Sequence, residues 1–76
     1  MLDTIREIVV KYVDIEPEKI TEQTDFKSDL DIDSFTFMSI IAEIEEKAGI
    51  ELPLEEVSEL STVGELIEMI RTKQAQ

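Results

Sequence analysis

Three aspartates at alternate positions lead directly into a serine, and these are the residues of the chain best suited to chemistry. Residues 29–34 read DLDIDS. The alternating carboxylates match the first three ligand positions of an EF-hand calcium loop. The sixth position of that loop should be glycine and the twelfth glutamate, but here they are Ser34 and Ile40. We therefore predict no dedicated metal site, only loose binding of divalent cations that relieves charge repulsion.

The serine has no catalytic partner of the usual kind in the sequence. The chain contains no histidine and no cysteine, so it lacks the commonest general base, a thiolate nucleophile and the commonest zinc ligands. A serine hydroxyl is a poor nucleophile unless a base activates it. We predict that the chain is not an enzyme and has no catalytic residues. The simplest alternative for Ser34 is an ordinary serine at a helix end.

The charge of the chain is strongly negative and unevenly distributed. Its 19 acids and 7 bases give a net charge of −12, and residues 28–70 contain only one base, Lys47. Such a surface repels nucleic acid and attracts basic protein surfaces, so we expect protein partners and no nucleic acid. The alternative is a solvated face that only keeps the chain soluble. Because like charges disfavour ionisation, we also expect carboxylate pKa values above their unfolded values on average, and stability that increases as the pH falls from 7 toward about 5.

The length and hydropathy of the chain limit its organisation. We expect one domain, residues 1–76, that is monomeric. No stretch of about 18 apolar residues occurs, and no basic N-terminal region precedes an apolar segment. These absences predict no membrane span, no secretory signal and a cytoplasmic location.

Apolar residues at helical spacing predict an all-α fold, a small four-helix bundle with three main helices and one short helix. The first helix should cover residues 2–14, with Tyr12 on its apolar face, and a long loop, residues 15–32, should connect it to the second helix. Pro53 suits the first turn of a short third helix. The loop anchors and the inward-facing residues of the third and fourth helices should be Ile15, Ile20, Phe26, Leu30, Leu54, Val57, Leu60, Val63, Leu66, Ile67 and Ile70.

Capping signals set the ends of the second and fourth helices. Asp33 is a plausible N-cap for a second helix over residues 34–48, and Gly49 suits the position after its end. Thr62 and Glu65 form a capping-box pattern that opens the fourth helix. The polar residues after Arg71 should fray.

The second predicted helix carries two apolar stripes. The core stripe consists of Phe37, Ile40, Ile41, Ile44 and Ala48. A second stripe lies on the side of Ser34 and consists of Phe35, Met38 and Ala42. Glu45 and Glu46 continue this side of the helix. Exposed aromatic and methionine side chains suit contact with several partners, so we predict partner docking there. The alternative is that these side chains pack under the long loop as ordinary core.

The pattern as a whole resembles the acyl carrier protein family from about residue 5 to residue 70. The matching segments are Ile20-Thr21, Phe26, Asp29-Leu30, Asp33-Ser34-Phe35, Ile50-Glu51-Leu52-Pro53 and Ser61-Thr62-Val63. The resemblance implies that a phosphodiester joins Ser34 to 4′-phosphopantetheine, donated from coenzyme A by a Mg²⁺-dependent phosphopantetheinyl transferase. Asp33 would help to present the serine. The residues that could line an apolar pocket for the acyl chain are Phe26, Ile40, Ile44, Val57, Leu60, Ile67 and Ile70.

A carrier of this kind tethers acyl intermediates as thioesters on the phosphopantetheine thiol. Its expected partners are the transferase and the fatty-acid, polyketide or related biosynthetic enzymes with basic docking surfaces. Two alternatives stay open. One is an aminoacyl or peptidyl carrier, although such carriers more often have glycines before the serine. The other is an unmodified acidic module that binds a basic protein.

Four positions depart from the family pattern. Asp31 stands where the family usually has glycine, and Phe37 replaces something smaller. Thr36 and Ser39 occupy outward positions that are often acidic in fatty-acid carriers. These changes weaken the negative potential beside the serine and suggest a specialised carrier.

Overall fold

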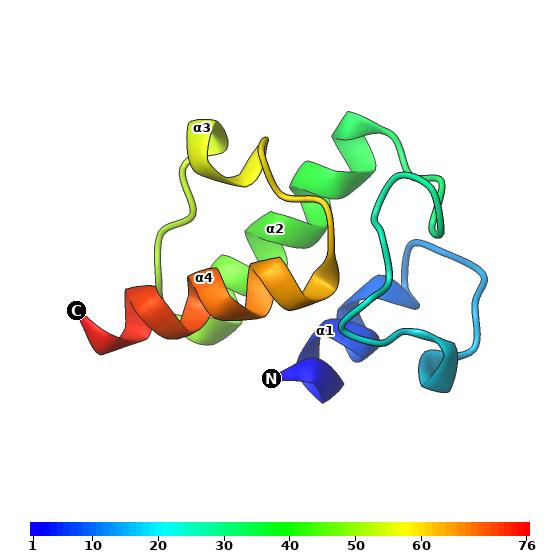
Figure 1. Cartoon of the computed structure of the whole chain (residues 1–76), viewed down its shortest axis with the longest axis horizontal. Coiled ribbons are helices and arrows are strands. Elements are labelled where there is room, and N and C mark those ends of the chain that lie inside the picture. Colours follow the sequence, from blue (N-terminus) through cyan, green and yellow to red (C-terminus); the bar gives the residue numbers. More distant parts are fainter.

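The computed structural model describes residues 1–76 and consists of helices joined by ordered loops (Figure 1). The elements are α1 (Leu2–Val9), the 3₁₀ helix η1 (Pro17–Lys19), α2 (Ser34–Ala48), α3 (Leu54–Val57) and α4 (Val63–Ala75). There is no strand, only an isolated β-bridge between Asp25 and Thr62. The predicted all-α bundle, with one short helix and a long loop between its first two helices, is confirmed. None of the helices combines the length and apolar character needed to cross a membrane.

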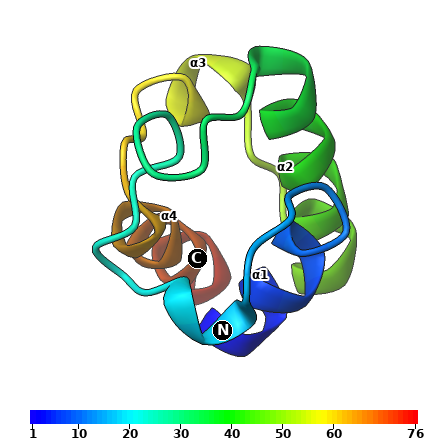
Figure 2. The same cartoon turned by 90° about the vertical axis from the view of Figure 1, so that its right-hand side faces the viewer.

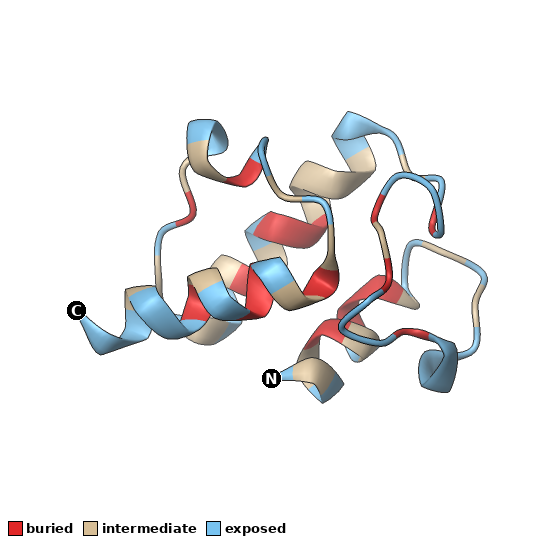
Figure 3. Ribbon diagram, viewed as in Figure 1, coloured by how far each residue is buried: buried red, intermediate tan, exposed pale blue.

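The helices enclose a single apolar core. Viewed along the long axis of the molecule, α1, α2, α3 and α4 surround a common interior (Figure 2). Fifteen buried apolar residues fill it, and Figure 3 shows buried segments on each of these four helices and on the long loop. Three of the four predicted loop anchors are buried, and the fourth, Ile15, is half-buried against the core. Thr24 is the one buried polar residue, and its hydroxyl accepts a hydrogen bond from the Thr21 N–H at 2.8 Å.

The first helix is shorter than predicted. α1 ends at Val9, because the N–H groups of Lys11 and Tyr12 bond to carbonyls only three residues back, at 3.1 and 2.9 Å. Such tight turns are common at helix ends, and the β-branched residues around Val9 favour a helix less than unbranched ones do. Tyr12 is consequently 41% exposed and does not face the core as expected.

The second helix has the predicted limits, residues 34–48. Asp33 is its N-cap, and the carboxylate accepts a hydrogen bond from the Thr36 N–H at 2.7 Å. Gly49 ends the helix with φ 68°, in the left-handed region that glycine adopts without steric cost.

The third helix is a single turn, and one prediction about it is wrong. Val57 is buried and Leu60 is half-buried, as expected, but Leu54 is 59% exposed. A helix of four residues turns only one position fully inward, and that position is taken by Val57. The neighbouring Leu54 therefore lies at the edge of the bundle.

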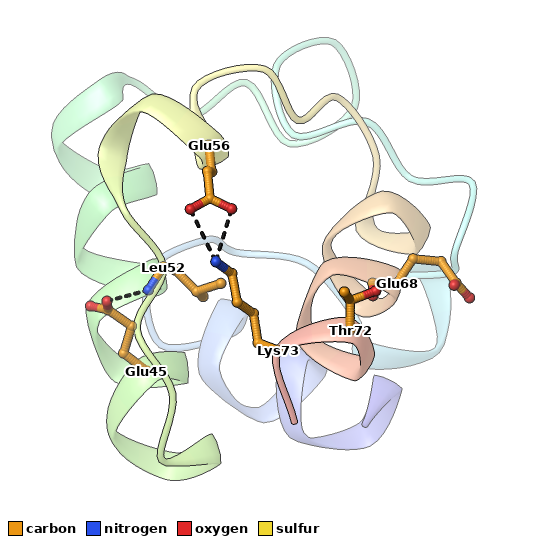
Figure 4. Close-up of polar contacts among 6 residues, drawn as sticks. All are labelled: Glu45, Leu52, Glu56, Glu68, Thr72 and Lys73. Atoms are coloured by element: carbon orange, nitrogen blue, oxygen red, sulfur yellow. Dashed lines mark hydrogen bonds and ion pairs between the residues drawn. The ribbon is translucent and has the colours of Figure 1, made fainter. Parts of the chain in front are cut away.

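The fourth helix begins as predicted but continues beyond the predicted fraying point. Thr62 and Glu65 form the capping box, with the Thr62 hydroxyl accepting from the Glu65 N–H at 3.2 Å. The helix then extends to Ala75. Its last turns are tied down because the Lys73 ammonium pairs with Glu56 of α3 at 2.9 Å (Figure 4). The residues expected to face the core are all buried.

Candidate functional site

Ser34 is the first residue of α2 and is exposed at the N-terminal end of the helix. The preceding residue, Asp33, fixes the start of the helix through its bond to the Thr36 N–H, and this bond lowers the pKa of Asp33. The carboxylate is therefore ionised near neutral pH. Asp33 thus places the Ser34 hydroxyl at the tip of a capped helix, where another protein can reach it.

The loop that leads to Ser34 is held by hydrogen bonds from its own acids. The Asp25 carboxylate accepts from the N–H groups of Ser28 and Lys27 at 2.9 and 2.8 Å, and these bonds lower its pKa. Asp29 accepts from the Asp25 N–H at 2.7 Å. These two carboxylates therefore order the loop. No group of three or more carboxylates is arranged to hold a metal ion.

The same loop is also fastened to the beginning of α4. Backbone hydrogen bonds join the Phe26 N–H to the Ser61 carbonyl, the Val63 N–H to the Thr24 carbonyl and the Gly64 N–H to the Glu22 carbonyl, at 2.9, 2.9 and 2.8 Å. A Cβ atom at Gly64 would lie 3.0 Å from the Glu22 carbonyl oxygen. Glycine therefore permits this close approach. No local signal indicates this role of Gly64, because the contact joins segments about forty positions apart.

Asp31, where the resemblance led us to expect glycine, has a backbone conformation that glycine adopts readily. Its φ is 52°, and it is the only residue other than glycine with a positive φ. Aspartate tolerates the left-handed region better than most residues. The turn before Ser34 is therefore made here without glycine, at a modest conformational cost.

A pocket of about 230 Å³ opens beside Ser34, between α2, α3 and the long loop. Seven of its eleven lining residues are hydrophobic, and Lys27, Asp33, Ser34 and Ser58 supply the polar part. The rings of Phe26 and Phe37 meet edge to face with centroids 5.2 Å apart, and both line the pocket. Phe37, where the resemblance led us to expect a smaller residue, thus contributes to the wall of the pocket.

The residues suggested for an acyl pocket divide into two groups. Phe26, Val57 and Leu60 line the pocket beside Ser34. The others belong to the closed core and do not reach this pocket; they are Ile40, Ile44, Ile67 and Ile70. Leu54, Ile32 and Met38 also line it, although the sequence did not single them out for this role.

The predicted docking residues are likewise not all alike. Phe35 is 83% exposed, and Ala42 and Glu46 are exposed as well. Met38 is instead half-buried, packs against the core and lines the pocket. Glu45 is half-buried, and its carboxylate accepts a hydrogen bond from the Leu52 N–H at 2.7 Å (Figure 4). Met38 and Glu45 are therefore engaged with the protein itself.

Glu43, which the sequence analysis did not single out, joins α2 to the turn that follows α1. Its carboxylate accepts hydrogen bonds from the Lys11 ammonium and the Tyr12 hydroxyl. The bond from Lys11, followed by that from Tyr12, lowers the pKa of Glu43, and the same contact raises the pKa of Tyr12. The cation that partners Glu43 comes from the turn after α1, so neither helix alone indicates the contact.

Four carboxylates have shifted pKa values, and all four are lowered by hydrogen bonds. We call them the hydrogen-bonded carboxylates: Asp25, Asp33, Glu43 and Glu65. The expectation that mutual repulsion raises the pKa values is wrong for these groups. Hydrogen bonds from backbone N–H groups, or from the side chains of Lys11 and Tyr12 in the case of Glu43, favour the ionised carboxylates. This effect outweighs the repulsion between carboxylates, which solvent and salt screen at the surface.

Comparisons with known proteins agree with this geometry. A family model described as a phosphopantetheine attachment site matches residues 3–70. The acyl carrier protein of Wolinella succinogenes is 36% identical over 72 residues, 95% of each chain. The acyl carrier protein of Caulobacter vibrioides is 35% identical over 75 residues, 99% of this chain and 96% of its own.

The fold is also similar to a solved structure. The acyl carrier protein of Enterococcus faecalis superposes with a TM-score of 0.80 at 30% identity, over 95% of this chain and 91% of that one. Sequence and structure thus agree along nearly the whole length. The chain belongs to the acyl carrier protein family, whose members have a phosphopantetheine attachment site.

Proposed function

We propose that Ser34 is the residue that bears 4′-phosphopantetheine, and that the chain presents acyl groups held on it to biosynthetic enzymes. The observation that carries this proposal is the position of Ser34. It is exposed at the capped start of α2, at the edge of a largely apolar pocket, within the matched family segment. Other serines in the chain lack this combination of features.

The residues around Ser34 fit the prosthetic group chemically. A phosphodiester needs an accessible hydroxyl and neighbouring positive charge, and a pantetheine arm has both amide and methyl groups. The pocket is lined by Ser34, Lys27 and Ser58 and by an apolar wall that includes Phe37 and Leu54. When bound, the group supplies the thiol on which acyl chains are held as thioesters.

The role of the chain in attachment is to present the hydroxyl, since no nearby base can activate it. A phosphopantetheinyl transferase using coenzyme A and Mg²⁺ would supply that base and the donor. Asp33 holds the first turn of α2 in place, so the Ser34 oxygen stays at the helix tip. We propose that the chain has no catalytic activity of its own.

The proposed docking surface consists of Phe35, Ala42 and Glu46, the exposed part of the predicted docking residues. Met38 and Glu45 support it from within. An exposed phenylalanine beside carboxylates suits an enzyme surface that combines an apolar patch with basic residues. Fatty-acid, polyketide or related synthetic enzymes are the proposed partners, supported by the similarity to acyl carrier proteins. The single domain, the monomeric state and the cytoplasmic location remain predictions.

The test is loading by a broad-specificity phosphopantetheinyl transferase with coenzyme A and Mg²⁺, followed by intact-mass spectrometry. One phosphopantetheine should be added to the wild-type chain and none to Ser34→Ala. The matched control is Ser28→Ala, another exposed serine six positions earlier, which should load normally. Circular dichroism should give the same helix content for both variants. An unmodified wild-type chain, tested with several transferases, would instead favour a non-covalent interaction module.

A further inference from the structure

Lys27 is an isolated positive charge in the most acidic part of the chain. It is the only base between Lys19 and Lys47, and four aspartates lie within six positions of it. Even so, none of the ion pairs of the structure involves Lys27. Lys27 is an exposed residue and is one of the residues that line the pocket beside Ser34. Lys27 is therefore the one residue with a full positive charge that lines this pocket, and although its charge acts on nearby Asp25 it forms no ion pair.

Attachment of a phosphodiester at Ser34 adds a negative charge where negative charge is already concentrated. The chain carries a net charge of −12, and Asp33 is the immediate neighbour of the modified residue. Like charges this close disfavour one another. The positive end of the α2 dipole offsets part of this repulsion, but Asp33 already occupies the Thr36 N–H. Among the residues that line the pocket, Lys27 is the one that can compensate the rest with a full positive charge.

We propose that the Lys27 ammonium pairs with the phosphodiester that joins the prosthetic group to Ser34, and thereby keeps the first part of the arm at the mouth of the pocket. This inference rests on the proposed attachment at Ser34. Lysine suits the role because its apolar stem can lie along the pocket wall while the ammonium group stays in solvent beside the phosphate. Lys27 is thus a positioning residue for the prosthetic group.

The first readout is the ³¹P chemical shift of the loaded protein, which reports the surroundings of the phosphate directly. We expect Lys27→Met to change this shift and Lys27→Arg to preserve most of it. The matched control is Lys47→Met. Lys47 is also exposed and also makes no ion pair, but it lies thirteen positions along α2, about 20 Å from Ser34 along the helix axis. Its removal should leave the ³¹P shift unchanged.

The second readout is the change in melting temperature on loading, measured for each variant. Loading should lower the melting temperature of Lys27→Met by about 2–6 °C more than it lowers that of the wild type or Lys47→Met. This difference should shrink in high salt, which screens an exposed pair. Because loaded and unloaded forms of the same variant are compared, any effect of the substitution on folding alone cancels.

The outcomes separate the two proposals. If mass spectrometry finds no group on Ser34, the proposed function fails and the inference about Lys27 fails with it. If loading is normal but Lys27→Met leaves both readouts like those of Lys47→Met, the attachment site stands and the pairing is refuted.

Discussion

Replacement of Gly64 by alanine tests whether the close contact between the long loop and α4 holds the site in place. An added Cβ would lie 3.0 Å from the Glu22 carbonyl oxygen and 3.3 Å from the Glu22 Cβ. Real Cβ atoms rarely come so close, so the loop backbone must move, and the 2.8 Å hydrogen bond between Gly64 and Glu22 must lengthen. Overpacking of this kind costs about 1–3 kcal/mol, and a lost hydrogen bond about 0.5–1.5 kcal/mol.

The helix propensity of alanine acts in the opposite direction. Within a helix, alanine is favoured over glycine by about 1 kcal/mol. The net expectation is that Gly64→Ala destabilises the fold by about 0.5–3.5 kcal/mol. Each kcal/mol lowers the melting temperature by about 4–8 °C in a domain of this size. Urea unfolding followed by circular dichroism measures the free energy.

Gly49 provides the matched control because glycine is needed there for its backbone conformation and not for lack of space. A Cβ there would meet nothing within 4 Å, but φ is 68°. Gly49→Ala should therefore be destabilising, and Gly49→Asn should recover part of the loss, since asparagine tolerates this region. At position 64 asparagine should be no better than alanine. A Gly64→Ala variant as stable as the wild type, or more stable, would refute the steric argument.

Three further predictions concern the docking surface, the core and pH. Phe35→Ala should slow loading by a transferase while changing the melting temperature little, because the ring is 83% exposed, whereas Ile44→Ala should cost about 2–5 kcal/mol in urea unfolding. Glu45→Gln should destabilise the fold by about 1 kcal/mol in the same assay, since it weakens the charged acceptor of the Leu52 N–H, and an unchanged midpoint would contradict that role. The hydrogen-bonded carboxylates have folded pKa values below their ordinary values of 3.8 and 4.5, so their stabilisation is complete above about pH 5 and is lost as the pH falls through and below those values. Melting temperatures that instead rose steadily from pH 5 to pH 3 would show that repulsion dominates.

The parts of the fold that the sequence predicted correctly depend on local signals. Asp33 and Gly49 mark the two ends of α2. A carboxylate at the N-cap and a glycine after the last turn stabilise the ends of the helix to which they belong, so the signals are local. The capping box of Thr62 and Glu65 likewise needs only residues three positions apart. The apolar periodicity of α2 and α4 identified their buried faces for the same reason.

Where the structure departs from the expectations, the cause is a contact between distant segments or the limited length of an element. The end of α4 is ordered by Glu56, a residue of α3, and Glu45 is engaged by the backbone of Leu52 beyond the end of its helix. Leu54 was expected to point inward, but α3 is too short to bury both of its leucine and valine side chains. Hydrophobic spacing cannot distinguish a core position from the wall of a pocket.

The candidate site was also predicted where its signals are local and only in part where it depends on packing between elements. Ser34 and Asp33 were identified from a contiguous motif, because the motif contains the helix cap as well as the serine. The pocket was predicted only in part. Its walls come from α2, α3 and the long loop, and the close packing of Phe26 against Phe37 could not be derived from either residue alone.

The central claim is that Ser34 carries the prosthetic group. The most direct test is tandem mass spectrometry of the loaded chain after proteolysis, which locates the added group on a single residue. We predict that the phosphopantetheine is found on Ser34, in the peptide that includes Asp33 and Phe35, and on no other serine or threonine. A group located at Ser28, Ser39 or Ser58 instead would contradict the claim.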